Sequence, residues 1–267
     1  MHKKIKNITL IGAGNVATNL AHLFLKNNLV IEQVYSKQLN SAKKISEFTN
    51  SSATDKISEI NKNSDLYIIS VNDNSYTDII NKLKIKKTAF IVHTSGSINI
   101  NIFKNKFTNY GVFYPLQTFT KNKILDFNEI PLCIEANTHE NLQTLNNFAS
   151  QFSNNINLIN SEQRKIIHLS AVFACNFTNH MIDIAYRINE QNNINPDILI
   201  PLITETIKKT TENHPKNNQT GPAKRNDNKI ISEHIDMLNK IFTAKDLKNI
   251  AKLYSFVSRN IQDLNKK

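Results

Sequence analysis

The pattern of apolar and polar positions divides the chain into two parts. Up to about residue 160, short runs rich in β-branched residues alternate with amphipathic stretches such as "NVATNLAHLFLKNN" and "NSAKKISEFT". This alternation predicts parallel strands joined by right-handed crossovers. We therefore expect an α/β fold, with a Rossmann-type, doubly wound and mainly parallel sheet in a dinucleotide-binding domain over residues 1–160. The expected strands span 5–11, 29–36, 65–71, 88–94, 110–115, 130–136 and 156–160.

The second part, residues 161–267, reads as an all-helical domain. Its first 31 residues, 161–191, contain neither proline nor glycine, and their apolar spacing predicts one long helix. Ser161 and Glu162 suit the first turn of this helix, although Arg164 cannot complete a capping box with Ser161.

Further helices are expected downstream of this long helix. Pro196 opens one of them, with Asn195 as a suitable N-cap. The apolar periodicity of residues 226–241 and 246–261 predicts two more.

Composition narrows the class of protein. There is no apolar run of about eighteen residues, so we expect no membrane span. The start "MHKKIKNITLIGAG" reads as a first strand and not as a signal peptide. Cys133 and Cys175 cannot form a disulfide framework, which favours a reducing, cytoplasmic location.

The net charge of +11 raises the question of nucleic-acid binding. The basic residues are 29 lysines and 4 arginines, and the lysines are scattered among Asn and Ile. Phosphate-reading surfaces cluster their cations and favour arginine. We therefore expect no nucleic-acid partner; a basic nucleic-acid binder, which would show salt-sensitive affinity, is the least favoured interpretation.

The segment "ITLIGAGNVATNLAHLF" carries a G-x-G-x-x-A motif directly after an apolar strand and at the head of a helix. Gly12 allows the tight turn, Gly14 lets the backbone approach a pyrophosphate, and Ala17 permits close packing of helix on strand. The helix N-terminus then faces the anion. The motif predicts a dinucleotide site that includes Ala13, Asn15 and Val16; the alternative is a tight turn without a ligand.

The end of the second strand distinguishes the two nicotinamide dinucleotides. An NAD site usually has an acidic residue there, which binds the ribose 2′-hydroxyl. Here Glu32 falls too early, and the strand ends at Ser36 and Lys37. A hydroxyl and a cation without an acid favour the 2′-phosphate of NADP(H). Alternatively, Lys37 is simply a solvated lysine.

Polar residues follow the next two long strands, in "SVNDNS" and "HTSGS". The carboxyl ends of parallel strands border the ligand crevice, so these residues should lie near the nicotinamide half of the cofactor. We expect hydride transfer beside His93 and Ser95 with Gly96 near the substrate, although His93 could equally be a satisfied core group. The cofactor contacts expected from these two segments are Val71, Asn72, Asp73 and Thr94.

The order of motifs resembles a known bacterial family. The glycine turn, "HTSGS", "YPLQTF", an Asn-Phe step on the long helix and "TGPAKRND" follow one another as in proteins that join a Rossmann-like NADP domain to a helical domain of unknown function. That family is similar to pyrroline-5-carboxylate reductases, deazaflavin-dependent NADP reductases and β-hydroxyacid dehydrogenases.

The resemblance covers nearly the whole chain and has three implications. The helical domain should form a homodimer, and the long helix should bring residues over the nicotinamide. Asn176 matches an asparagine of the β-hydroxyacid dehydrogenases, but the lysine they carry four residues earlier is Val172 here, which puts ordinary hydroxyacid oxidation in doubt. His168, Cys175, Asn176 and Asn179 share one helix face, which could overlook the crevice, a dimer seam or a core.

The segment "TGPAKRND" combines two scarce residue types. Gly221 is one of five glycines and Arg225 one of four arginines. Gly221 and Pro222 break the helical pattern, after which Lys224 and Arg225 present cations that suit a carboxylate or phosphate. Asp227 either orients Arg225 or caps the following helix. We interpret the segment as an anion clamp for the substrate; the alternative is an exposed helix–helix loop.

These observations favour an NADP(H)-dependent oxidoreductase acting on a small anionic carbonyl or imine compound, without a metal. The alternative is a non-catalytic NADP(H)-binding sensor or regulatory protein, which the missing lysine favours.

Overall fold

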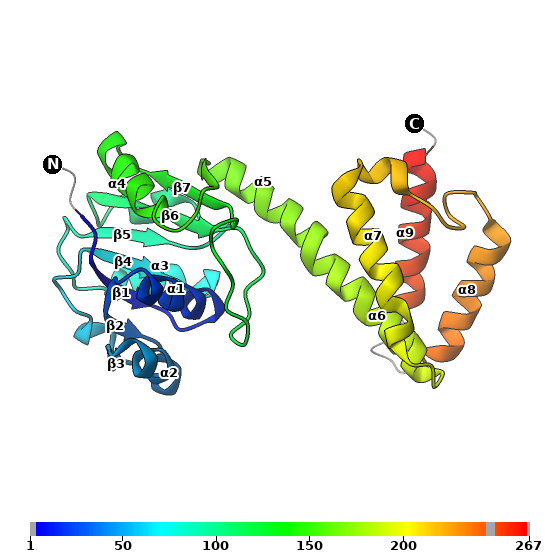
Figure 1. Cartoon of the computed structure of the whole chain (residues 1–267), viewed down its shortest axis with the longest axis horizontal. Coiled ribbons are helices and arrows are strands. Elements are labelled where there is room, and N and C mark those ends of the chain that lie inside the picture. The colour runs from blue at the N-terminus through cyan, green and yellow to red at the C-terminus, as the bar shows by residue number, and fades with distance from the viewer. Residues whose placement is uncertain (1–3, 244–248, 266–267) are drawn as a thin grey trace. The chain divides into compact units, whose positions relative to one another are not determined.

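The computed structural model describes residues 4–243 and 249–265, which divide into two compact units, residues 1–175 and 176–267. Strands occur only in the first unit among the residues described (Figure 1). The chain turns all-helical at residue 161, as the apolar pattern predicts, whereas the compact units divide at 175/176, within the expected long helix.

The first unit is built on one sheet, which has eight strands within the described residues, in the order β3-β2-β1-β4-β5-β6-β7-β8. All neighbouring pairs are parallel except β6 and β7, which confirms the expected doubly wound, mainly parallel sheet. The strands are β1 (Asn7–Ile11), β2 (Val30–Tyr35), β3 (Ser52–Thr54), β4 (Leu66–Ile69), β5 (Phe90–His93), β6 (Asn109–Pro115), β7 (Leu132–Ala136) and β8 (Ile156–Leu158).

The short edge strand β3 was not predicted. It contains only Ser-Ala-Thr, which is too short to show a period of two. It forms because its backbone pairs with β2 from Gln33 to Tyr35, a tertiary contact that local sequence does not encode.

Alternate residues of the buried strands point to opposite faces of the sheet and so contribute to two cores, one on each face. Leu10 and Ile68 pack in the core beneath the helices on one face, while Ile11 and Ile69 pack in the opposite core. The helices of the first unit are α1 (Asn15–Lys26), α2 (Leu39–Thr49), α3 (Tyr76–Lys82), α4 (His139–Ala149) and α5 (Ser161–Ala171), with 3₁₀ turns at Ile57–Glu59, Asp73–Ser75 and Ile100–Phe103.

The two cores assign the helices to faces. Buried side chains of α1, α2 and α4 belong to the first core, and those of α3 and the 3₁₀ turn at Ile100–Phe103 belong to the second. Figure 1 shows α1 and α3 beside the strands of the first unit. Burial of each large apolar side chain contributes about 1.5–3 kcal/mol, and this sandwich holds the strand ends in place.

The long helix runs as predicted from residue 161 to 191, but it is not uniform. A π-helical turn, Val172–Phe177, separates α5 from α6 (Thr178–Gln191). Its N-cap is Asn160 and not Ser161: the Asn160 side chain accepts from the Gln163 amide, and the Gln163 side chain accepts from the Asn160 amide. The capping box therefore exists one residue earlier than the position considered from the sequence.

The second unit is helical throughout the residues described. Asn195 caps the 3₁₀ turn Pro196–Leu199, which leads into α7 (Ile200–Glu212), as expected from Pro196. After a second 3₁₀ turn, Pro215–Asn218, come α8 (Asn228–Ile241) and α9 (Asn249–Asn265). These two helices match the periodicity of 226–241 and 246–261, although residues 246–248 lie outside the part of the chain that the structure describes.

Candidate active site

A cavity of about 650 Å³ lies in the first unit, at the carboxyl ends of β1, β2, β4, β5 and β6. This is the edge at which open parallel sheets bind their ligands. Ser95 and Gly96 line it together with every residue that the sequence assigned to the cofactor. Those cofactor residues are Gly12, Ala13, Gly14, Asn15, Val16, Ser36, Lys37, Val71, Asn72, Asp73 and Thr94.

The glycine turn has the geometry that a phosphate site requires. Gly12 has φ +125°, and a Cβ there would lie 1.9 Å from the backbone oxygen of Ser70. Gly14 is the N-cap of α1, where no side chain caps the helix and a Cβ would meet nothing within 4 Å. The first turn of α1 thus has no capping side chain, and the partial positive charge of its amides suits the diphosphate of a dinucleotide.

Around the end of β2 the cavity wall carries no acidic side chain; its residues there are Tyr35, Ser36, Lys37, Gln38 and Ser41. The nearby carboxylate in sequence, Glu32, is held by the Ser64 hydroxyl and by the Asn61 amide at 2.8 Å. Its acceptor capacity is therefore used away from the cavity. The wall offers hydroxyls and one cation at the place where a cofactor ribose would lie.

The strand ends of β4 and β5 are tied together by a side-chain hydrogen bond. Ser95 Oγ donates to Asp73 Oδ1 at 2.8 Å and accepts from the amides of Ser97 and Ile98 at 3.0 and 3.1 Å. The hydroxyl that the sequence put forward for catalysis is thus engaged in three hydrogen bonds. Its visible role is to shape the turn after β5.

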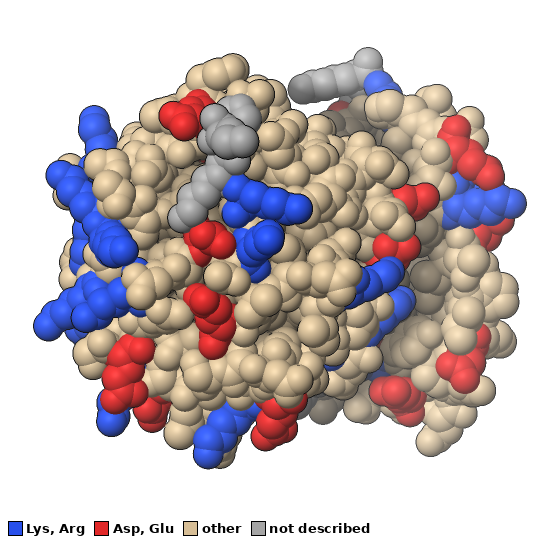
Figure 2. Space-filling view, turned by 60° about the vertical axis from the view of Figure 1, so that its left-hand side comes forward, with Lys and Arg blue, Asp and Glu red and all other residues tan. Residues whose placement is uncertain are grey.

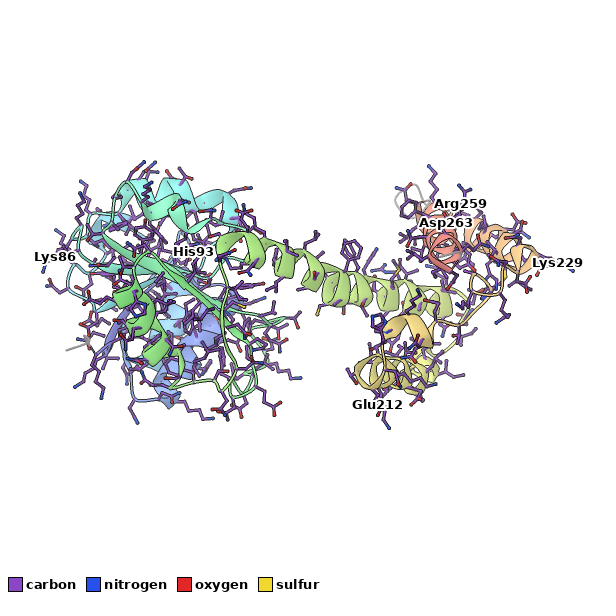
Figure 3. All side chains as sticks on the ribbon, turned by 90° about the horizontal axis from the view of Figure 1, so that it is seen from above. Lys86, His93, Glu212, Lys229, Arg259 and Asp263 are labelled. Atoms are coloured by element: carbon purple, nitrogen blue, oxygen red, sulfur yellow. The ribbon has the colours of Figure 1, made fainter. Side chains whose placement is uncertain are left out.

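His93 is placed in the core and not on the cavity wall. Its side chain is 0% exposed, between the rings of Tyr76 and Phe103, and Figure 3 labels it within the first unit. Nδ1 accepts from the Ser95 amide at 3.2 Å, whereas Nε2 has no partner among the described residues. Burial, with a smaller effect from the Arg164 charge, lowers the His93 pKa to about 3. A neutral, enclosed imidazole fits the core alternative better than proton transfer.

Arg164 is the buried cation of this region, and its role was not recognised in the sequence. From α5 it forms an ion pair with Glu135 and donates to the backbone oxygens of Ser95 and Ile98. These bonds help to fix the turn after β5, which is the same turn that the Ser95 hydroxyl shapes. In the sequence it is an unremarkable arginine on a helix, because Glu135 and the turn lie about 30 and 70 residues away.

The structure also brings together two side chains that the sequence never paired. Tyr114, near the end of β6, and His168, on α5, both line the cavity, and Tyr114 Oη lies 3.1 Å from His168 Nδ1. Burial is the main factor that raises the Tyr114 pKa to about 12. The "YPLQTF" motif and the position of His168 on a helix face were the available signals, but neither revealed their contact.

The remaining predicted site residues belong to the second unit. Asn176 is an exposed residue of the π-helical turn. Gly221 has φ +97° and opens a compact turn closed by the bond from the Asp227 amide to the Pro222 oxygen. Lys224 and Arg225 are exposed, and Lys224 Nζ donates to Asn265 at 2.6 Å.

The two possibilities for Asp227 are resolved in favour of capping. Its side chain accepts from the Ile230 amide at 3.3 Å, at the start of α8. Contact of Asn176 and of the 221–227 turn with a substrate stays a prediction.

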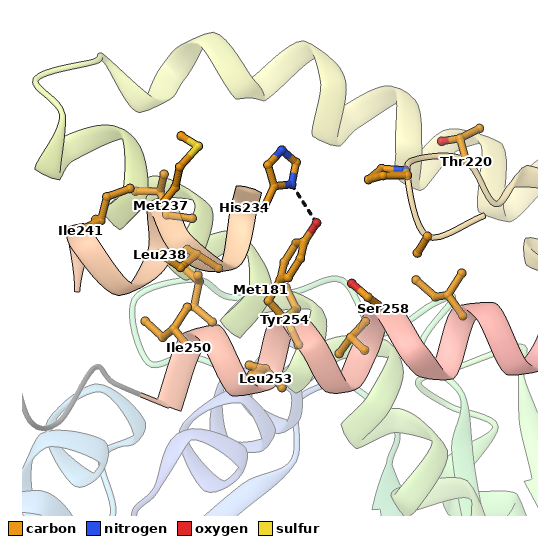
Figure 4. Close-up of a pocket in the computed structure, with 16 residues that line it drawn as sticks. Met181, Thr220, His234, Met237, Leu238, Ile241, Ile250, Leu253, Tyr254 and Ser258 are labelled. Carbon is orange, nitrogen blue, oxygen red and sulfur yellow. Dashed lines mark hydrogen bonds between the residues drawn. The ribbon is translucent and has the colours of Figure 1, made fainter. Parts of the chain in front are cut away.

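The second unit contains an apolar cavity of about 440 Å³ between α6, α8, α9 and the 220–223 turn (Figure 4). Most of its lining is aliphatic, and Pro222 is among the lining residues. The one hydrogen bond drawn there joins His234 Nδ1 and Tyr254 Oη, 2.8 Å apart.

On the face shown in Figure 2, lysines and arginines lie interspersed with acidic side chains. Among the described residues, no cluster of three His, Cys, Asp or Glu side chains could hold a metal ion. Over the same residues, none of the helices combines the length and apolarity needed to cross a membrane. The expectations of no metal, no nucleic-acid partner and a cytoplasmic location stay predictions.

Two protein families match successive parts of the chain. Residues 7–96 match the family described as NADP oxidoreductase coenzyme F420-dependent, and residues 130–261 match a domain of unknown function, DUF2520. These matches confirm the resemblance inferred from the motifs. No curated protein matches the sequence.

Solved structures extend the comparison. The chain is 40% identical to "putative NADP oxidoreductase BF3122 from Bacteroides fragilis", with 97% of this chain and 98% of that one covered and a TM-score of 0.91. Protein TM1727 from Thermotoga maritima is 23% identical, with 97% and 98% covered and a TM-score of 0.68. A 1-pyrroline-5-carboxylate reductase from Streptococcus pyogenes shares the fold at 12% identity, with 98% and 100% covered and a TM-score of 0.61.

Proposed function

Because this chain belongs to the family that joins an NADP oxidoreductase domain to DUF2520, we propose that it transfers a hydride between NADP(H) and a small anionic carbonyl or imine compound. The observation that carries the proposal is the 650 Å³ cavity, which joins the glycine turn, the acid-free end of β2 and the polar ends of β4 and β5.

The residues of the cavity fit NADP(H) part by part. The open space at Gly14 and the uncapped amides of α1 suit a diphosphate. Ser36 and Lys37 would hold the 2′-phosphate, because no carboxylate lines the cavity at the end of β2. From the strand order, β4 and β5 lie on the other side of β1 from β2, so Asn72, Asp73 and Thr94 would border the nicotinamide.

When bound, NADPH supplies the hydride, and the chain supplies orientation and electrostatics. The turn after β5 is held by Arg164 on one side and by Asp73 on the other, so its backbone is a rigid wall beside the reacting carbon. Lys121, which also lines the cavity, would attract an anionic substrate. The Arg225 turn of the second unit is the further cationic element proposed for substrate binding.

Calorimetric titration with NADPH, NADH, NADP⁺ and NAD⁺ tests this proposal. We expect NADPH to bind at least tenfold more tightly than NADH, a difference of about 1.4 kcal/mol. Preference for NADH would contradict the assignment of Ser36 and Lys37, and failure of all four to bind would overturn the proposed function. Carboxylate-bearing ketones and cyclic imines are then screened for NADPH oxidation.

A sensor that binds NADP(H) without turnover is the second candidate. It is supported by Val172, which stands where β-hydroxyacid dehydrogenases carry lysine. Tight, stoichiometric NADPH binding without oxidation on the whole substrate panel would favour the sensor over the enzyme.

We also propose that the second unit forms a homodimer with a second copy of the chain. Six apolar side chains of its described residues are buried and only three of them form a cluster, while Ile198, Leu202 and Phe256 are 70%, 65% and 72% exposed. So large an unburied apolar surface is typical of an interface. Light scattering should give a dimer that Leu202→Lys weakens, whereas the matched change at exposed Leu158 in β8 should leave the mass unchanged; a monomeric wild-type protein would contradict the proposal.

A further inference from the structure

We propose that His168 is the general acid of the hydride-transfer reaction and that Tyr114 holds its imidazole in position. This inference rests on the proposed function and adds a catalytic residue to it. It starts from the contact between Tyr114 Oη and His168 Nδ1, 3.1 Å apart on the cavity wall.

The position of the pair along the sheet edge places it at the end of the cavity where the nicotinamide is expected. The diphosphate end is at β1, and β4, β5 and β6 follow in that order away from β2. Tyr114 is in β6, and the imidazole of His168 lies against the turn after β5. A nicotinamide bordered by the ends of β4 and β5 therefore has this pair beside it.

The imidazole is closely packed in this position. A Cβ at Gly96 would lie 2.6 Å from His168 Cγ and 2.7 Å from Nδ1. Glycine at 96 is what lets the ring approach the turn, and the Tyr114 ring packs against the imidazole edge to face. A catalytic group must be held in this way for its orientation to contribute to the rate.

In this proposal the imidazole is the proton donor and the phenol is its fixed partner. Burial, helped by Cys133, raises the Tyr114 pKa to about 12, so its hydroxyl remains protonated and serves as a fixed hydrogen-bonding partner. Histidine side chains as a class titrate near neutrality. With Nδ1 directed to Tyr114, Nε2 of His168 makes no hydrogen bond with the residues described and is available to a substrate.

The reaction balances without any further reagent. The substrate carbon takes two electrons and one hydrogen from the reduced nicotinamide, and a C–H bond forms. The π pair of the C=N or C=O group moves to nitrogen or oxygen and takes the proton from Nε2. The products are the amine or alcohol and the oxidised cofactor, and neutral His168 regains its proton from water.

The inference predicts a proton linkage that needs no substrate. An imidazolium beside the nicotinamide repels the cationic ring of NADP⁺ but not the neutral ring of NADPH. Other charged groups near the pair are present both in the wild-type protein and in the His168→Gln variant. They therefore contribute equally to the two measurements described below. The titratable or charged groups around the pair are Asp73, Lys121, Cys133, Arg164 and Lys165.

The experiment is a measurement of the Kd values of NADP⁺ and NADPH between pH 5.5 and 8. Their ratio cancels the titration of the phosphates that both forms share. We expect the ratio Kd(NADP⁺)/Kd(NADPH) to fall about tenfold as pH rises, which corresponds to about one pKa unit of coupling. In His168→Gln it should stay constant within about twofold. His139→Gln, an exposed histidine of α4, is the matched control and should keep the tenfold change.

The outcomes separate this inference from the function on which it rests. If neither cofactor form binds, both the proposed function and this inference are overturned. If both bind and the wild-type ratio is independent of pH, or if His168→Gln keeps the change, only the assignment of His168 is overturned. Thermal unfolding of each variant establishes that it is folded.

Turnover and the Tyr114→Phe variant complete the test. On any substrate that the screen finds, His168→Gln should lower kcat by about 10²–10⁴-fold, the range typical of a general acid. Tyr114→Phe keeps the imidazole but removes its partner, so the linked titration should persist with a shifted midpoint. An unchanged midpoint would overturn the positioning role of Tyr114.

Discussion

The Ser95 hydroxyl donates a 2.8 Å hydrogen bond to the Asp73 carboxylate and so ties the end of β5 to the turn after β4. The same oxygen accepts from two amides of its own turn. Ser95→Ala should therefore lower the free energy of unfolding by about 1–3 kcal/mol, because two partly buried amides lose their acceptor. It should also weaken NADPH binding.

Urea unfolding and calorimetry check this prediction, with Ser97→Ala as the control. Ser97 lies in the same turn and donates its amide, but the described structure gives its side chain no hydrogen bond. Equal effects of the two changes would show that the Ser95–Asp73 bond has no particular importance.

Gly12 and Gly14 should respond differently to alanine. At Gly12 a methyl group meets a backbone oxygen at 1.9 Å and φ is +125°, so Gly12→Ala should destabilise the fold by several kcal/mol. At Gly14 the space is open and φ is −84°, so Gly14→Ala should leave the melting temperature nearly unchanged. It should nevertheless weaken NADPH binding at least tenfold, because the methyl group occupies the expected diphosphate site. If Gly14→Ala bound NADPH as tightly as the wild-type protein, the diphosphate could not lie at Gly14.

The end of β2 should set the choice of cofactor. Ser36→Asp places a carboxylate where the 2′-phosphate is expected, and Coulomb repulsion should reverse the preference from NADPH to NADH. The measurement is the ratio of the two Kd values at fixed ionic strength. The same change at Ser41, also on the cavity wall but within α2, serves as the positional control and should have the smaller effect.

His93 should make folding stability depend on pH. Its folded pKa is about 3, below the ordinary value of 6.5, so between these values the unfolded chain binds more protons than the folded one. Stability contributed by the neutral imidazole is therefore present above pH 6.5 and is lost as pH falls towards 3. The slope is about 1.4 kcal/mol per pH unit from this one group.

The comparison that isolates this effect is wild type against His93→Gln. Urea unfolding at pH 4.5, 5.5 and 7.5 should show the stability advantage of wild type shrinking as the pH is lowered. A difference that is constant with pH would mean that the pKa of His93 is the same in the folded and unfolded protein, and would return His93 to consideration as a proton donor.

Arg225 tests the anion clamp. Arg225→Gln should raise KM for a carboxylate substrate about tenfold or more, because a bidentate charged contact is lost. NADPH affinity and the melting temperature should not change, since the side chain is exposed. Arg187→Gln, which removes an exposed arginine paired with Asp183 on α6, should leave KM as it is. Equal KM values in all three proteins would support the helix–helix loop interpretation.

The lining of the cavity at the sheet edge could be predicted almost residue by residue, while the binding of a cofactor by these residues stays a prediction. Gly12, Gly14, Ser36 and Asp73 are local features: each follows a strand at a spacing that parallel topology carries to one edge of the sheet. His93 shows where this reasoning fails. It follows the same rule of position, but its ring turns into the core between Tyr76 and Phe103, and side-chain direction at a strand end is decided by packing.

The sequence by itself determined the alternation of elements, the mainly parallel sheet, the glycine turn and the acid-free end of β2. Each of these depends on periodicity or spacing within some thirty residues, where local sterics and hydrophobic burial act directly. Only the tertiary structure decided that strand β3 forms, that Arg164 supports the turn after β5, and that His168 meets Tyr114. The last two contacts join residues 69 and 54 positions apart through docking of α5 on the sheet, and β3 forms by pairing with β2 residues 19 positions earlier; no local pattern reports them.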